Sequence, residues 1–139
     1  MNIFDEYFTG DCSIALENVS YKKLDDLNED VTLSVNDDLN IKENVNGSNF
    51  IEIIITRNLS FAPKSLVDIT VTFSVYLELN EKYAKNSVID YKALKNYLLF
   101  KENTLTTIVM SRISLLISQL TSSYGERPII TPPSFMTED

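Results

Sequence analysis

Apolar and polar residues alternate with a period of two in four stretches before residue 80. In the longest, residues 66–79, seven apolar side chains share one phase, and hydroxyls and acids occupy most of the other. Such alternation predicts β-strands with one buried face and one face in water. Strands of a parallel sheet buried on both faces are continuous apolar runs instead. The pattern therefore predicts an antiparallel sheet with one wet face. The three other stretches are residues 11–19, 31–42 and 49–61.

The links between these stretches predict how the strands connect. Asn46–Gly47, between the second and third stretches, is a strong hairpin signal, and Pro63 marks a turn before the fourth. The last three strands are therefore predicted to form a meander. The link after the first strand is longer and lacks glycine, so it is long enough to cross over the sheet. Asp37 interrupts the apolar phase of the second strand, and a bulge or bend is expected near Asp37–Asp38.

After residue 87 the period changes to about 3.6, which is typical of helices. This pattern predicts a short helix over residues 88–100. Its apolar residues form a stripe on one side, and Lys92 and Lys95 lie on the opposite side. A longer helix is predicted from the N-cap Asn103 to a stop at Gly125, with Arg112 as its only charge. The fold class is α+β: a four-stranded antiparallel sheet followed by two helices packed on one face, as a single domain over residues 1–139. The apolar arc of the longer helix comprises Leu105, Ile108, Val109, Ile113, Leu116, Ile117 and Leu120.

Two helices and an apolar, proline-containing C-terminal segment are more cover than one sheet face needs. They either close a single core or leave apolar surface for an oligomer interface or a groove. Aromatic and aliphatic side chains on a short helix suit an interface between subunits. We therefore expect an oligomer interface on the stripe of the short helix, formed by Tyr91, Leu94, Tyr97 and Leu98.

The composition of the chain limits the classes of function that we expect. The chain has 139 residues, a net charge of −8, no histidine, one cysteine and three glycines. Without histidine or a glycine-rich phosphate loop, an enzyme and a bound cofactor or metal are not expected. The acidic balance disfavours nucleic acid, and without an apolar run of about 18 residues no membrane insertion is expected. The acidic N-terminus and the lone Cys12 favour a cytoplasmic location.

The order of these segments resembles the SecB family of protein-export chaperones. The segments that carry the resemblance are FTGDCSIALENVSY (8–21) and the stretch from Asn103 to Phe135. TPPSF, residues 131–135, is similar to the proline- and phenylalanine-containing ending of the family. The chain lacks the glycine pair that the family carries late in its fourth strand, and it ends at MTED, without the family's last helix.

The resemblance implies a homotetramer, a dimer of dimers, with an apolar groove for unfolded polypeptide clients and no nucleotide requirement. It also implies docking to the translocation motor ATPase through carboxylates on the outer sheet face. Asp11 stands at one such position and Asp68 close to another, whereas Ala15 stands where the family has a further acid. The residues expected to line the client groove are Val19, Tyr21, Leu24, Leu27, Val109, Ile113, Ile129, Ile130 and Phe135.

Two alternatives stay open for the C-terminal segment: it lines this groove across an oligomer, or it clamps the core of its own chain. Three functions are weighed. The first is a general holdase for unfolded chains that serves export. The second is a SecB-like scaffold dedicated to one segment of an antitoxin or phage protein. The third is a site for a small apolar ligand between the sheet and the helices.

Overall fold

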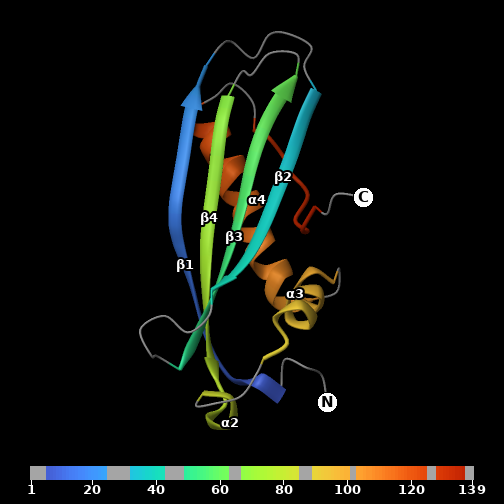
Figure 1. The fold of residues 1–139 in the computed structure, drawn as a ribbon. Helices are drawn as coiled ribbons and strands as arrows, with labels where there is room; N and C mark the ends of the chain where they lie inside the picture. Colours follow the sequence, from blue (N-terminus) through green and yellow to red (C-terminus); the bar gives the residue numbers. More distant parts are fainter. Residues whose placement is uncertain are drawn as a thin grey trace.

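The computed structural model describes residues 6–24, 32–42, 49–62, 67–84, 89–100, 103–124 and 128–136. A four-stranded sheet comes first and helices follow it, as the sequence predicts (Figure 1). The short α2 was not predicted. The elements are β1 (Phe8–Lys23), β2 (Thr32–Lys42), β3 (Phe50–Ala62), β4 (Val67–Leu79), α2 (Glu81–Ala84), α3 (Tyr91–Leu99) and α4 (Thr104–Tyr124).

The strands lie in the order β1-β4-β3-β2, and every neighbouring pair is antiparallel. The predicted meander of the last three strands is therefore confirmed. β1 pairs with β4 at the far edge from β2, so the chain crosses from one edge of the sheet to the other between its first two strands.

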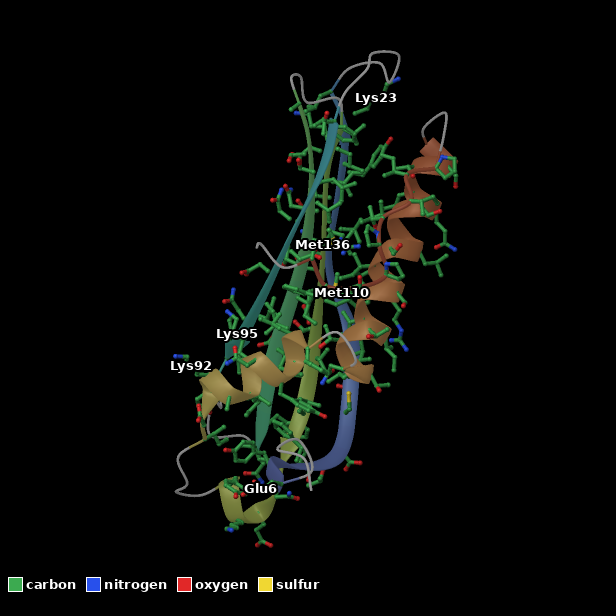
Figure 2. The ribbon with its side chains drawn as sticks, turned by 90° about the vertical axis from the view of Figure 1, so that its right-hand side faces the viewer. Glu6, Lys23, Lys92, Lys95, Met110 and Met136 are labelled. Atoms are coloured by element: carbon green, nitrogen blue, oxygen red, sulfur yellow. The ribbon has the colours of Figure 1, made fainter. Side chains whose placement is uncertain are left out.

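One face of the sheet, called here the dry face, carries the core. Every second residue of β4 from Val67 to Leu79 is buried on it, as the alternation predicts. α4 crosses behind the sheet in Figure 1, and Figure 2 shows Met110 on the side of α4 that faces the strands. The buried apolar side chains that the helices contribute are Leu94, Leu98, Val109, Met110, Ile113 and Ile117.

Both helix starts are capped by side chains. The Asp90 carboxylate accepts a hydrogen bond from the Ala93 backbone N–H at 3.0 Å, and α3 begins there. Asn103 Oδ1 accepts from the Thr106 N–H at 3.0 Å, which confirms the predicted N-cap of α4. Figure 2 shows Lys92 and Lys95 pointing away from α4, in agreement with a polar outer side of α3. The stop predicted at Gly125 lies outside the described residues.

The expected bulge near Asp37–Asp38 is wrong. β2 pairs with β3 without any shift from Thr32 to Lys42, so Asp37 stays in the apolar phase and points to the dry face. It can do so because Arg57 lies directly opposite on β3, on the same face. The charged residue that interrupts the apolar phase of β2 therefore indicates a cross-strand ion pair and not an interruption of the strand.

Register shifts occur instead in β1. One lies between Phe8 and Cys12, where Gly10 has a φ of 101°, a backbone region that glycine enters without strain. The other lies between Leu16 and Asn18. An extra residue moves the strand from one phase to the other. Val19 therefore returns to the face occupied by Leu16, and β1 continues to Lys23 instead of ending at Val19.

α4 is long and apolar enough, by length and composition alone, to cross a membrane, although no uninterrupted apolar run of that length exists in the sequence. A core helix meets the same criterion. In this structure Val109, Met110, Ile113 and Ile117 are buried against the rest of the chain, so α4 serves as a core helix here.

The burial pattern of α4 yields a direct test. We expect Met110→Ala to lower the free energy of unfolding by about 2–4 kcal/mol, because it leaves a cavity beneath the helix. Ile108→Ala, on the same helix at 41% exposure, is the matched control and should cost less than about 1 kcal/mol. Urea unfolding followed by circular dichroism measures both. Equal losses at the two positions would contradict this packing.

Candidate functional site

A buried ion pair lies on the dry face, at the position where a bulge or bend was expected. Arg57 Nε donates to Asp37 Oδ1, and Arg57 Nη2 donates to Asp37 Oδ2, both at 2.7 Å. Both side chains are fully buried. The two residues are direct cross-strand partners in the β2–β3 register, so the sheet itself sets their separation. This two-point geometry gives a strong charge-assisted contact.

The remaining donors of Arg57 bind the C-terminal segment. Its Nη1 donates to Thr131 Oγ1 at 2.9 Å and to the Pro132 carbonyl at 2.6 Å, and its Nη2 donates to the Ser134 carbonyl at 2.9 Å. A guanidinium has five N–H donors. Two of them bind Asp37 and three bind the C-terminal segment, so the buried cation is fully satisfied.

Residues 128–136, called here the C-terminal strap, are also tied to α4. Ser114 Oγ donates to the Thr131 carbonyl at 2.6 Å, and the Ile129 N–H donates to Thr121 Oγ1 at 2.7 Å. The strap runs back beside α4, behind the sheet in Figure 1. Its far end is fixed where the Met136 N–H donates to Asp37 Oδ2 at 2.8 Å. Of the two alternatives left by the sequence, the structure shows the clamp on the strap's own chain.

The apolar side chains of the strap are unequally covered. Ile129 and Phe135 are half-buried and pack against the core, whereas Ile130 is 72% exposed. The three residues were predicted to act together on a client. In this structure Ile129 and Phe135 face the protein interior and Ile130 faces away from it.

Exposed apolar side chains remain on β1 and on the outer side of α4. Leu16 of β1 has the phase of the dry face, being paired with Phe73, yet it is 50% exposed. On α4, Leu115 is 59% exposed. Burial raises the pKa of the Cys12 thiol on β1, and the positive charge of Arg112 on α4 partly opposes that rise. The exposed apolar side chains of these two elements, Leu16, Ile108 and Leu115, are called here the β1–α4 border.

The other residues predicted to contact a client lie in different settings. Val109 and Ile113 are fully buried under α4, and Val19 and Tyr21 are half-buried on β1. Leu24 is 46% exposed at the end of β1. Their roles stay predictions, and the buried pair presents no surface in this structure. Leu27 lies outside the described residues.

The stripe predicted for an oligomer interface is divided in the same way. Leu94 and Leu98 are buried in the core of the single chain, because they face the inner side of α3. Tyr91 and Tyr97 are half-buried. Only the two tyrosines therefore offer surface to a second copy, and the interface stays a prediction.

The predicted motor-docking carboxylates do not lie together. Asp11 is exposed in the first register shift of β1, while Asp68 pairs with Lys22 near the other end of the strand. Eleven residues of strand separate those positions along β1, which is roughly 35 Å. The structure therefore places the two acids at opposite ends of the wet face, and their docking role stays a prediction.

The wet face is a network of polar side chains between those two ends. The Tyr76 hydroxyl donates to Glu17 at 3.1 Å, and Ser74 Oγ donates to Glu52 at 2.9 Å. The hydrogen bond to Glu17 is the main cause that raises the pKa of Tyr76. Among the described residues, no three or more histidine, cysteine or acidic side chains form a group that could hold a metal ion.

Sequence reasoning missed the ion pair, although a signal was present. Asp37 and Arg57 each interrupt an otherwise apolar phase, on two stretches between which the sequence has the hairpin signal Asn46–Gly47, and their charges are opposite. Two such interruptions on adjacent strands predict a cross-strand pair. The link from Arg57 to the strap carbonyls has no such signal, because backbone acceptors leave no mark in the sequence.

The ion pair predicts an asymmetry between single and double substitutions. We expect Arg57→Met to lower the free energy of unfolding by about 3–5 kcal/mol, because it leaves a buried carboxylate without its partner. Adding Asp37→Leu should restore part of that loss, since an apolar pair carries no desolvation cost. Urea unfolding of the three proteins measures the difference. A double variant less stable than Arg57→Met would contradict the assignment.

With the geometry established, comparison with solved structures shows a likeness in fold. A SecB-like chaperone from Mycobacterium tuberculosis, solved in complex with a ChAD peptide from an antitoxin, is 10% identical, with 86% of each chain covered and a TM-score of 0.65. A protein of unknown function from Streptococcus agalactiae is 12% identical, with 88% of this chain and 98% of that chain covered, but its TM-score of 0.35 supports no argument. No protein-family model and no curated protein matches the chain. The four-stranded antiparallel sheet followed by helices agrees with the first neighbour, and this chain therefore has a divergent SecB-like fold.

Proposed function

We propose that this chain is an ATP-independent, cytoplasmic SecB-like chaperone that holds segments of unfolded polypeptides. The observation that carries the proposal is the β1–α4 border, where Leu16 is 50%, Ile108 41% and Leu115 59% exposed. A non-native chain exposes apolar side chains of its own, and burying them against such a border is favourable without any specific sequence. Binding by this surface is an equilibrium, so neither a nucleotide nor an enzymatic step is part of the proposal.

Charge supports the choice of client. The chain carries 20 acids against 12 bases, and its wet face presents acidic groups such as Glu17, Glu52 and Asp68. An acidic surface attracts basic segments and raises the rate at which they are encountered. We therefore propose apolar segments flanked by lysine or arginine as preferred clients. We also propose that the protein passes such clients to the translocation motor ATPase for export, with Asp11 and Asp68 as contacts to the motor.

A second candidate is a scaffold dedicated to one partner segment. The observation that favours it is the neighbour of like fold, which was solved with a peptide from an antitoxin. In this form the same surface holds one defined segment and does not protect unrelated clients. A small apolar ligand between sheet and helices has no comparable support, because the described side chains pack that space as a continuous core.

The proposal also includes a homotetramer, a dimer of dimers. Outward-facing Ile108 and Leu115 lie on a helix whose only charge is Arg112, and such a face is favourable to cover with a second copy. Tyr91 and Tyr97 of α3 extend the surface available for assembly. Light scattering after size exclusion should then give four times the chain mass of 15.8 kDa. A monomer at micromolar concentration would remove the tetramer from the proposal.

Suppression of aggregation tests the chaperone itself. We expect the protein to keep a reduced, unfolded and unrelated client soluble without ATP. Leu16→Ser/Leu115→Ser should weaken client binding about tenfold or more, because two exposed apolar contacts are lost. Phe50→Ser is the matched control, since Phe50 is 40% exposed but belongs to the opposite phase of the sheet, and it should leave binding unchanged.

The outcomes separate the candidates. No protection of an unrelated client, together with tight binding of one defined segment, would favour the dedicated scaffold over the general chaperone. Protection that is equally lost in the Phe50 control would mean that the β1–α4 border is not the binding surface. The mass of each variant is measured in parallel, so that a change in assembly is not mistaken for a change in binding.

A further inference from the structure

The C-terminal strap is held mainly by its backbone. Five of the six hydrogen bonds described above use strap backbone atoms: the carbonyls of residues 131, 132 and 134 and the N–H groups of residues 129 and 136. Only Thr131 contributes a side-chain atom, its Oγ1. Contacts of this kind recognise an extended chain with a particular spacing, whatever its side chains, as strand-like peptide binding does elsewhere.

The groups that hold the strap are also positioned by contacts that do not involve it. The pairing of Asp37 with Arg57 follows from the β2–β3 register and from two hydrogen bonds that do not involve the strap. Ser114 and Thr121 lie on α4, whose buried side packs on the sheet. If the strap left, three N–H donors of Arg57 would remain directed at the same place. The result is a preformed row of polar groups for an extended peptide.

Proline fits the middle of this row. The polar groups of the row accept hydrogen bonds from strap N–H groups only at positions 129 and 136. Between these positions they donate to strap carbonyls. Pro132 and Pro133, which have no N–H, therefore lose nothing there. Proline also restricts the free peptide, so less conformational entropy is lost when the segment is fixed.

The side chains of the strap are only partly buried. Ile130 is 72% and Met136 39% exposed, and the two adjacent prolines are exposed as well. Apolar anchoring comes from Ile129 and Phe135, which are half-buried. Side chains that are only half-buried give a fraction of the free energy of a fully buried one. A second segment with the same backbone spacing can therefore compete.

We propose that the strap is a resident peptide ligand, displaced when an extended, proline-containing apolar segment of a bound polypeptide takes over the Arg57 donors. The proposal rests on the proposed function, because it names a site and a regulation for polypeptide binding. It reverses the role expected for Ile129 and Phe135: these side chains hold the strap in place and so oppose client binding.

The test uses the full chain and a fluorescein-labelled peptide with the sequence of residues 128–136. Ile129→Ser/Phe135→Ser loosens the strap and leaves the receiving groups intact, so it should bind the peptide about tenfold or more tightly than the unsubstituted protein. Ile130→Ser is the matched control. It alters a neighbouring isoleucine that is 72% exposed, and the affinity should change less than about twofold.

A third protein removes the receiving groups. In the loosened protein, Asp37→Leu/Arg57→Met should weaken peptide binding about tenfold or more, because the three donors to the peptide are gone. Thermal melting and circular dichroism confirm that each variant is folded. Thr131→Val, which removes only one side-chain acceptor, is a milder second variant with an expected gain in affinity of about threefold.

The binding measurements can either support or overturn the proposed role of the strap. Peptide binding that is unchanged or weaker in the loosened protein, or that survives loss of Arg57 and Asp37, overturns the proposal. An unfolded client that is held but never displaced by the peptide also overturns it, while the proposed chaperone function stands. Arg57-dependent peptide binding without any client protection supports the strap site and counts against the general chaperone.

Discussion

The placement of the C-terminal segment depends on one buried cation. Arg57 lies on the dry face among isoleucines and leucines, where an unpaired charge would cost several kcal/mol. Its five donors are satisfied only when both Asp37 and the strap are present. The ion pair thus links β2, β3 and residues 128–136 in one polar cluster inside an apolar layer. A leucine at either position could pack as well, but it could not fix the register of a strap that is recognised through its carbonyls.

The proposed function depends on how much apolar surface the helices and the strap cover and how much they leave exposed. α4 covers the centre of the dry face and the strap covers the side toward β2, whereas Leu16 of β1 and the outer side chains Ile108 and Leu115 of α4 stay exposed. A chaperone needs accessible apolar surface, yet a large permanent patch promotes aggregation. A strap held by polar contacts to its backbone reconciles the two demands, because its removal uncovers apolar surface while the polar groups beneath remain paired or meet water.

Much of the fold could be predicted from the sequence, and the reasons are physical. In β4 every alternate apolar side chain is buried, because alternation directly reports the two faces of a sheet. Asn103 was predicted as a cap because its chemistry is local. The shift after Leu16 was missed, since an extra residue leaves the composition of a strand unchanged. The link from Arg57 to the strap was missed because two of its acceptors there are backbone carbonyls about 75 residues away along the chain.

The two edges of the sheet differ in a way that bears on self-association. Within the described part of the chain, no strand pairs with the outer side of β1 or β2. β1 carries two register shifts, and such irregularities interrupt the ladder that an incoming strand would need. β2 is regular over its whole length and has no such interruption. Fibril-like stacking or strand exchange between copies would therefore begin along β2, so the more vulnerable border of the sheet is the one beside the buried ion pair.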